Sequence, residues 1–476
     1  MKIIRILASA LAVLMIAGLL GCAKKATDKN DNGDNPVGEN GEIIAVWSDN
    51  TKITEEMFIY FFNAYYRYFI ETYSDSLENM GLDPAKSLSS QRHSDKYTWQ
   101  QYMVAQVYDQ LDDLIVLADA AMAEGMELSK EDKQEIDNQL AAYDKYAEDE
   151  NMTTEQYIVK AFGEGVTIDV MRSAIELRFL ANKYYDKLWN AYEFSDEDCL
   201  KYYGENKNNF VHFDCLQITV EPEYVDSLKA CTDEDSFIEA MRNAITETNF
   251  MGNYERFSDY IEAQLLKKRC NRMNYNPNLP LSKWVVKEER KPYDIHTKKE
   301  STDMVTVTMV LPTNDPGAIS DILYRDDEPV KNLKYIAFED SEGSEGKVKA
   351  DTIYKNWQED PTEERFDELL GEYNGAVANE IVRSQFNEQV NDWIFDSERK
   401  AGDSAVIPVS GGAYLVYMLE DGDPSWMVDV KAELKEESYQ KDLDSLFEKY
   451  PVNYVAEVVY NIEEVAVVDK TAEENQ

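Results

Sequence analysis

The sequence predicts an α+β protein of several domains, with a mainly helical first half followed by two small, related α+β modules. In the first half, through residues 43–210, apolar residues recur at three- and four-residue spacing, as in amphipathic helices. At His212 the pattern changes to the alternation of a β-strand. The same order of strand, helix, polar phrase and strand then occurs twice within residues 211–425, which indicates an internal duplication.

The first residues have the pattern of an export signal. Lys2 and Arg5 precede an apolar run, residues 6–20, that is short for a membrane span. The run ends in Leu-Leu-Gly-Cys, which resembles the bacterial lipobox and implies cleavage before Cys22 and attachment of a diacylglycerol to its thiol. We therefore expect a signal peptide at residues 1–21 and a lipid anchor at Cys22. The alternative is an ordinary signal peptide or an uncleaved anchor with a chance cysteine.

Residues 22–42 carry almost no large apolar side chain and are predicted to be a flexible tether. The tether contains the spacing of an EF-hand calcium loop, at Asp28, Asn30, Asn32, Gly33 and Glu39. No amphipathic helix flanks this spacing, so we expect no metal there.

Charge and cysteine usage exclude several classes of partner. The formal net charge of the 476-residue chain is −45, which repels nucleic acid and anionic lipid. The four later cysteines show no CxxC spacing, and the three histidines stand far apart, so we predict no metal, cofactor or thiol redox site. Export would allow disulfides, but the sequence leaves open the pairing of Cys199, Cys215, Cys231 and Cys270.

Residues 43–210 are predicted to open with a strand, a turn at Asp49 and Asn50, and a helix capped by Thr54. Further helices are expected over residues 97–125 and 168–191, and after Ser129, Thr153 and Ser195.

Two related phrases mark the duplicated modules: WVVKEERKPYD from Trp284 and WIFDSERKAGD from Trp393. Each tryptophan is expected to anchor a small core, and each arginine, Arg290 or Arg399, to pair with the aspartate that closes its phrase. The predicted domains are module one (211–312), a linker (313–330), module two (331–425), and a C-terminal region (426–476) with a helix, a strand-like segment at 453–468 and a polar tail.

Several stretches resemble the PrsA-type foldase lipoproteins and the related SurA chaperones. The first match is the opening VWSDNTKITEEMF; KYIAFED, RFDELLGEYN, RKAGDSAVIPV and GAYLVYML in module two resemble the conserved stretches of parvulin modules. The resemblance implies a SurA/PrsA-like N-terminal chaperone domain followed by two tandem parvulin-like modules. Parvulins are peptidyl-prolyl cis/trans isomerases with two histidines in the groove that holds the prolyl bond.

This chain departs from the family at both histidine positions. In module two they fall on Tyr335 and on Tyr414, or on Leu415 if the alignment slips by one residue; the matching positions of module one are Gln217 and Val305. His212, at the start of a strand, and His296, which we place in a turn, do not replace the pair. We therefore expect weak or absent isomerase activity.

The resemblance implies a chaperone or foldase, lipid-anchored at the extracytoplasmic face of a bacterial membrane, that binds exported unfolded polypeptides. Aromatic residues crowd one helix and are expected to lie partly in the core and partly along a client-binding groove: Phe58, Phe61, Phe62, Tyr65, Tyr66, Tyr68 and Phe69. One alternative is an active prolyl isomerase. Another is a solute-binding lipoprotein, which predicts two α/β lobes around a closed cleft. The client and the oligomeric state stay open.

Overall fold

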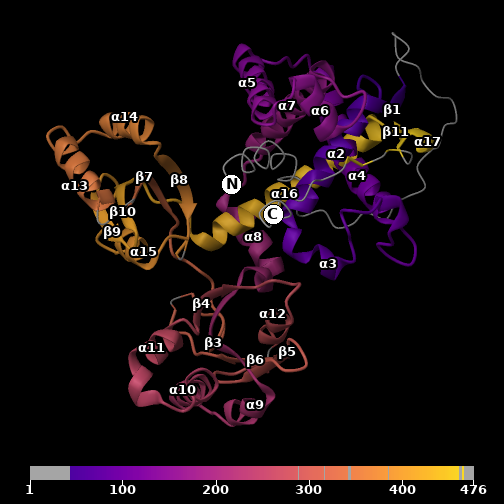
Figure 1. Cartoon of the computed structure of the whole chain (residues 1–476). Helices are drawn as coiled ribbons and strands as arrows, with labels where there is room; N and C mark the ends of the chain where they lie inside the picture. Colours follow the sequence, from indigo (N-terminus) through magenta and orange to yellow (C-terminus); the bar gives the residue numbers. More distant parts are fainter. Residues whose placement is uncertain are drawn as a thin grey trace. The chain divides into compact units, whose positions relative to one another are not determined.

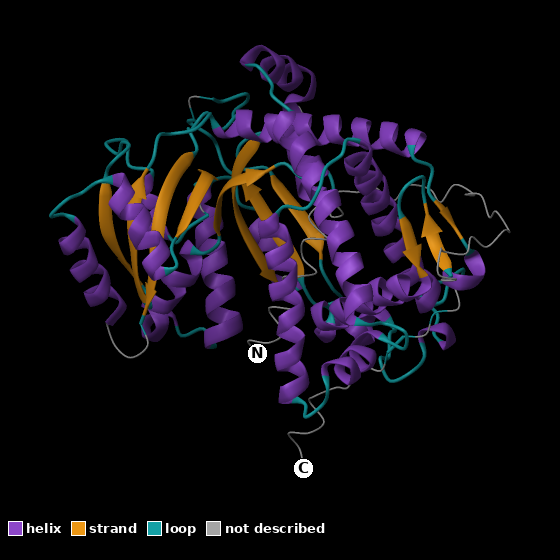
Figure 2. Cartoon of the chain, turned by 90° about the horizontal axis from the view of Figure 1, so that it is seen from above, coloured by secondary structure: helices purple, strands orange, loops and turns teal. Residues whose placement is uncertain are grey.

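The computed structural model describes residues 43–287, 289–315, 317–340, 345–383, 385–459, 462 and 464–465. The predicted signal peptide, Cys22, the tether and its EF-hand-like spacing lie outside the described residues. The chain divides into two compact units, Met1–Glu193 with Lys435–Gln476, and Phe194–Leu434. Both contain helices and antiparallel strands (Figures 1 and 2), so the predicted α+β class is confirmed.

The first unit begins with a β-hairpin and is otherwise mainly helical. Its elements are β1 (Ile44–Trp47), β2 (Lys52–Thr54), α2 (Glu55–Thr72), η1 (Ser74–Ser76), α3 (Leu77–Met80), η2 (Leu88–Ser90), α4 (Trp99–Ala123), α5 (Lys130–Asp149), α6 (Thr154–Phe162), α7 (Ile168–Ala191), the second half of α16 (Ser425–Lys449), β11 (Asn453–Tyr454) and α17 (Ala456–Val459). None of the described helices is long and apolar enough to cross a membrane.

The predicted helix starts are confirmed by their caps. The Thr54 hydroxyl accepts a hydrogen bond from the backbone N–H of Met57 at 3.3 Å. Capping boxes start α5 at Ser129 and α6 at Thr153. In each, the hydroxyl of the capping residue accepts from the backbone N–H of the third helical residue, and the side chain of that third residue accepts from the backbone N–H of the capping residue. Local sequence thus determines where these helices begin.

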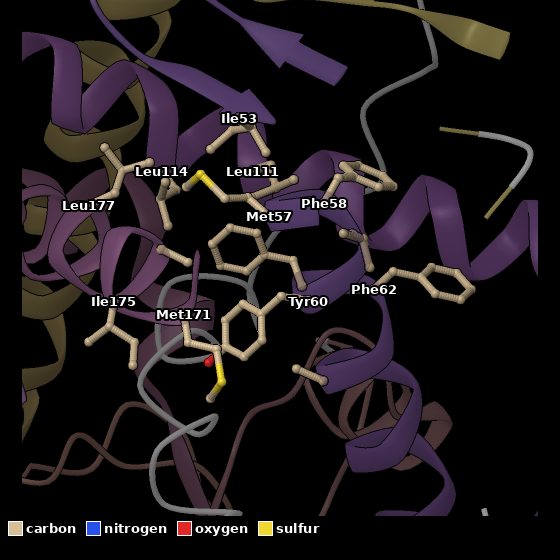
Figure 3. Close-up of a cluster of buried hydrophobic side chains, with 14 of the residues drawn as sticks. Ile53, Met57, Phe58, Tyr60, Phe62, Leu111, Leu114, Met171, Ile175 and Leu177 are labelled. Carbon is tan, nitrogen blue, oxygen red and sulfur yellow. The ribbon is translucent and has the colours of Figure 1, made fainter. Parts of the chain in front are cut away.

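Helix α2 lies in the middle of the apolar core of the first unit. Figure 3 shows Met57 and Tyr60 of α2 among Leu111 of α4 and Met171 of α7. Five of the seven aromatic residues singled out in the sequence are buried, and only two are half-buried: buried are Phe58, Phe61, Phe62, Tyr66 and Phe69, and half-buried are Tyr65 and Tyr68. The expectation that part of this series lies in the core is therefore confirmed, and only Tyr65 and Tyr68 keep ring surface outside it.

The C-terminal segment returns to the first unit. Strand β11 pairs with β1 in the antiparallel sheet β11-β1-β2, with Tyr454 opposite Val46. The strand predicted over residues 453–468 is limited, among the described residues, to Asn453–Tyr454 and is followed by α17. The N-terminal segment of the first unit ends at Glu193, whereas the sequence placed the boundary at residue 210.

The second unit contains two four-stranded antiparallel sheets. Its elements are α8 (Asp196–Asn206), η3 (Lys207–Phe210), β3 (His212–Val220), α9 (Pro222–Lys229), α10 (Glu234–Phe250), α11 (Tyr254–Leu266), β4 (Arg269–Asn274), α12 (Pro280–Val285), β5 (Ile295–Lys299), β6 (Val305–Val310), β7 (Lys331–Glu339), α13 (Glu345–Trp357), α14 (Glu363–Tyr373), β8 (Ala376–Ile381), α15 (Glu388–Ile394), β9 (Ser404–Val409), β10 (Gly412–Met418) and the first half of α16.

The two sheets have the same topology. Their strand orders are β4-β3-β6-β5 and β8-β7-β10-β9, so in each case the second strand in sequence lies beside the first, and the fourth beside the third. In both, a short helix between the second and third strands leads into the shared phrase. This common order supports the duplication indicated by the sequence.

The segment between the two sheets, predicted to be a linker, is packed rather than free. Ile322 and Leu323 are buried against the first sheet, and Tyr324 pairs with His212 through two backbone hydrogen bonds of 2.8 and 3.1 Å. Buried Asp326 lies 2.5 Å from the guanidinium of Arg272 on β4. These contacts could not be predicted from the sequence, because the segment is rich in turn-forming residues.

Candidate functional site

The two faces of the second sheet are built differently. Helices α13 and α14 cover one face, where Ile336 and Leu415 are fully buried in an apolar core. On the other face, α15 packs over Leu333 and Val416. Tyr335 and Tyr414 lie on this same face, beyond the area that α15 covers. Because side chains alternate along a strand, Tyr414 shares the face of Tyr335 and Leu415 does not. Leu415, the position in the alternative alignment, lies on the opposite face, which α13 and α14 cover.

Tyr335 and Tyr414 form an aromatic triad with Phe386, a residue that sequence reasoning missed. The two tyrosine ring centroids are 5.9 Å apart. Phe386 meets both rings edge to face, at 5.3 Å from Tyr335 and 5.9 Å from Tyr414. These separations are those of favourable aromatic pairs. No signal in the sequence pointed to Phe386, since it comes from the irregular segment before α15.

The aromatic triad offers apolar surface rather than acid–base chemistry. All three rings are half-buried, so each keeps a part in contact with solvent. Neither tyrosine hydroxyl forms a hydrogen bond with another residue that the structure describes. No group of three or more metal-ligating side chains occurs among the described residues either. The triad can therefore stack on an apolar or prolyl side chain, with two hydroxyls free to hydrogen-bond to a bound backbone.

In the first module, the position equivalent to Tyr414 is Thr306, so the prediction of Val305 is wrong by one residue. The shared phrase aligns strand β5 of the first module with strand β9 of the second. Strand β5 pairs with β6, and β9 pairs with β10, so these two pairings show which residue of β6 corresponds to each residue of β10. Val305 lies opposite Val220 and packs on the helix-covered core, whereas Thr306 lies opposite Thr219 on the other face. A one-residue shift moves a side chain to the opposite face of the sheet.

The corresponding face of the first module is polar and internally hydrogen-bonded. Gln217 donates from Nε2 to the Thr308 hydroxyl at 2.9 Å, and the Thr219 and Thr306 hydroxyls lie 2.9 Å apart. These four side chains occupy the sheet surface where the second module carries its tyrosines. The first module thus lacks the aromatic triad.

The two histidines of the first module have structural partners. His212 is buried, stacks on Tyr324 with centroids 5.9 Å apart, and has a pKa lowered by burial. His296 lies in strand β5, not in a turn as predicted, and its ring is 5.3 Å from that of Trp284. Burial lowers the pKa of His296 as well, and Arg290 adds to this. Both positions favour neutral, packed imidazoles.

The repeated phrase is a structural element in both modules. The guanidinium of Arg290 lies over the Trp284 ring at 4.6 Å, and that of Arg399 over the Trp393 ring at 4.9 Å. Each arginine lies 3.8 Å from the aspartate that closes its phrase. That aspartate also accepts a backbone N–H three residues earlier, at 3.1 or 3.2 Å. The tryptophans are half-buried against small cores, as predicted.

Several large apolar side chains are exposed in the first module, at the end of α10 and along α11. Met251 is 96% exposed and Leu266 is 79% exposed, and Tyr260 between them is 58% exposed. Met251 and Leu266 are the two most exposed large apolar side chains among the described residues. Singly exposed apolar side chains are normal on folded proteins, so these three by themselves define no binding surface.

Comparison with known proteins gives distant likenesses among solved structures. No family model and no curated protein matches the chain. Among solved structures, the chain is similar to a SurA-like chaperone of Campylobacter jejuni, from work on the virulence factor PEB4 and the periplasmic protein Cj1289. The two chains are 11% identical with a TM-score of 0.21, over 87% of this chain and 99% of the other. A likeness this distant transfers neither a domain arrangement nor an activity.

Proposed function

We propose that the protein is a membrane-anchored extracytoplasmic chaperone or foldase that binds exported, incompletely folded polypeptides. In this proposal the helical part is the SurA/PrsA-like chaperone domain, the two sheets with their helices are parvulin-like modules, and Cys22 carries the lipid anchor. The modules act as binding platforms with weak or no isomerase activity.

The observation that carries the proposal is the aromatic triad at the position of the parvulin histidines. Tyr335, Phe386 and Tyr414 present half-buried rings on an open sheet face, where a proline or another apolar side chain of a client can stack. These rings stand where the parvulin family has two histidine imidazoles. Affinity for unfolded chains is thus expected without efficient catalysis of prolyl rotation.

Client binding is tested with the full-length protein in detergent and a reduced, carboxymethylated polypeptide labelled for fluorescence anisotropy. We expect the double variant Tyr335→Ala/Tyr414→Ala to bind about tenfold more weakly, a loss of ~1.4 kcal/mol. The matched control is Tyr97→Ala, which removes a tyrosine that is 53% exposed in the other unit. Equal affinity of the double variant and the wild type would refute the aromatic triad as the binding site.

An active isomerase is the second candidate, favoured by the two tyrosine hydroxyls. Replacing Tyr335 and Tyr414 with phenylalanine keeps the rings and removes the hydroxyls. If the module only binds, this variant keeps its affinity and the wild type does not accelerate a proline-limited refolding reaction. If the module catalyses, the wild type accelerates refolding and the phenylalanine variant does not.

The proposed lipid anchor has a separate test. Replacement of Cys22 by serine is expected to release the protein from the membrane fraction. The solute-binding alternative predicted two α/β lobes around a cleft, whereas all strand pairs in the described ranges are antiparallel and belong to small separate sheets.

A further inference from the structure

Two of the cysteines lie directly opposite each other on neighbouring strands. Cys215 of β3 faces Cys270 of β4 in the antiparallel pair. Opposite residues in such a pair have Cα atoms about 4.5–5.5 Å apart. A disulfide requires a Cα separation of about 4.4–6.8 Å, so the backbone register already meets this condition.

Both side chains point to the same face of the sheet. Cys215 is fully buried, and half-buried Cys270 packs against the same apolar cluster. Both are free thiols in this structure. Cys231 packs against the helix-covered core on the opposite face, and Cys199 belongs to another cluster around Trp426. Within the described chain, Cys215 and Cys270 are therefore the pair that can join without rearrangement of the fold.

The two thiols also differ in the way thiol–disulfide exchange requires. A hydrogen bond from the Cys215 thiol and, to a smaller extent, the charge of Lys268 outweigh the effect of burial, so that the pKa of Cys270 is lowered to about 7. The same hydrogen bond and burial raise the pKa of Cys215. A half-exposed thiol with a pKa near neutrality is well suited to attack a disulfide.

We propose that Cys215 and Cys270 form a disulfide by exchange with a disulfide-bearing oxidant. The Cys270 thiolate attacks one sulfur of the oxidant and releases its first thiol. Cys215 then loses its proton, attacks the Cys270 sulfur of the mixed disulfide, and releases the second thiol. The protein gives up two electrons and two protons, which reduce one oxidant disulfide to two thiols.

The bond would fix the edge strand of the first sheet. Strand β4 pairs on one side only, with β3, and its register with β3 is irregular between Phe213 and Cys215. Arg272, two residues after Cys270, has a left-handed backbone with φ of 53° and pairs with Asp326 and Glu328. A disulfide next to this strained position would keep Arg272 paired with the two carboxylates, which belong to the segment that leads to the second sheet.

The test uses the full-length protein in detergent, reduced and then exposed to oxidised glutathione. After alkylation of free thiols, peptide mapping by mass spectrometry is expected to find the peptides of Cys215 and Cys270 linked, with Cys231 alkylated. The oxidised protein is expected to unfold at a higher temperature than the reduced protein, since the link closes a long loop. Neither readout involves a client, so a failure of the proposed chaperone function leaves the result intact.

Matched variants separate this pair from adventitious oxidation. Cys270→Ser is expected to abolish the linked peptides and the rise in unfolding temperature, whereas Cys231→Ser keeps both. The measurement on the wild type stands even if Cys270→Ser fails to fold. Absence of the link in folded wild-type protein, shown native by circular dichroism, would overturn the proposal, as would a link from Cys231 to either partner.

Discussion

Asp429 of helix α16 provides a quantitative test of the electrostatics of the second unit. Its carboxyl is half-buried. Burial raises the pKa of Asp429 to about 6, and the neighbouring carboxylates Asp326 and Glu433 add to the rise. In the unfolded chain the pKa of an aspartate is about 3.9. The change to test is Asp429→Asn, which keeps the shape of the side chain and removes its charge.

The sign and size of the effect follow from this difference in pKa. Because the folded pKa lies above the unfolded one, the folded state holds the proton more tightly. The resulting stabilisation is complete below about pH 4 and is lost as the pH rises through about 6. The difference of roughly two pKa units corresponds to about 3 kcal/mol at neutral pH. Asparagine is not subject to this loss, so the variant should be more stable than the wild type above pH 6.

Scanning calorimetry at pH 4 and pH 7.5 measures this difference. At pH 7.5 we expect Asp429→Asn to unfold about 6–12 °C above the wild type, given ~2–4 °C per kcal/mol for a unit of this size. At pH 4 the two midpoints should nearly coincide. The control Asp259→Asn replaces an exposed aspartate of α11 and should shift neither midpoint. Equal midpoints of Asp429→Asn and wild type at pH 7.5 would show that Asp429 ionises without cost.

Substitutions at three further positions test the packing within each unit. Buried Asn63 donates a hydrogen bond of 2.9 Å to the last carbonyl of α6 and accepts one of 2.9 Å from the backbone of Val465, so Asn63→Leu should cost ~1–3 kcal/mol, measured by urea unfolding. Thr153→Ala removes a capping box and should cost about 1 kcal/mol, with faster hydrogen exchange confined to the start of α6. Arg399→Met removes the guanidinium above Trp393 and should cost ~1 kcal/mol, whereas Arg399→Lys should recover only part of it.

Local signals in the sequence were sufficient for much of the fold. The helices after Ser129 and Thr153 could be predicted because a side chain caps each one within three residues. The polar edge strands β4 and β8 were missed, since neither shows apolar alternation. Strand β11 lies within the segment predicted as strand-like, but its pairing with β1 was not predicted, because no local pattern can reveal a partner at the other end of the sequence.

The site illustrates how a register error arises. Aligning the two modules without a gap placed Val305 with Tyr414, although alternation along β6 already separates the apolar side, with Val305, from the threonine side, with Thr306. Comparing faces rather than positions would have found Thr306. Phe386 could not be found in this way, because only the folded chain brings it to the two tyrosines.

The return of the chain at β11 has a consequence for the order of biogenesis. The second unit, Phe194–Leu434, is inserted in the sequence of the first. The two sides of the insertion meet where the Tyr192 hydroxyl donates to Asp442 at 2.7 Å. A chain that emerges from a translocation channel N-terminus first can complete the inserted unit while the helical unit still lacks its third strand and half of α16. The segment nearest the proposed anchor would thus be the last to mature.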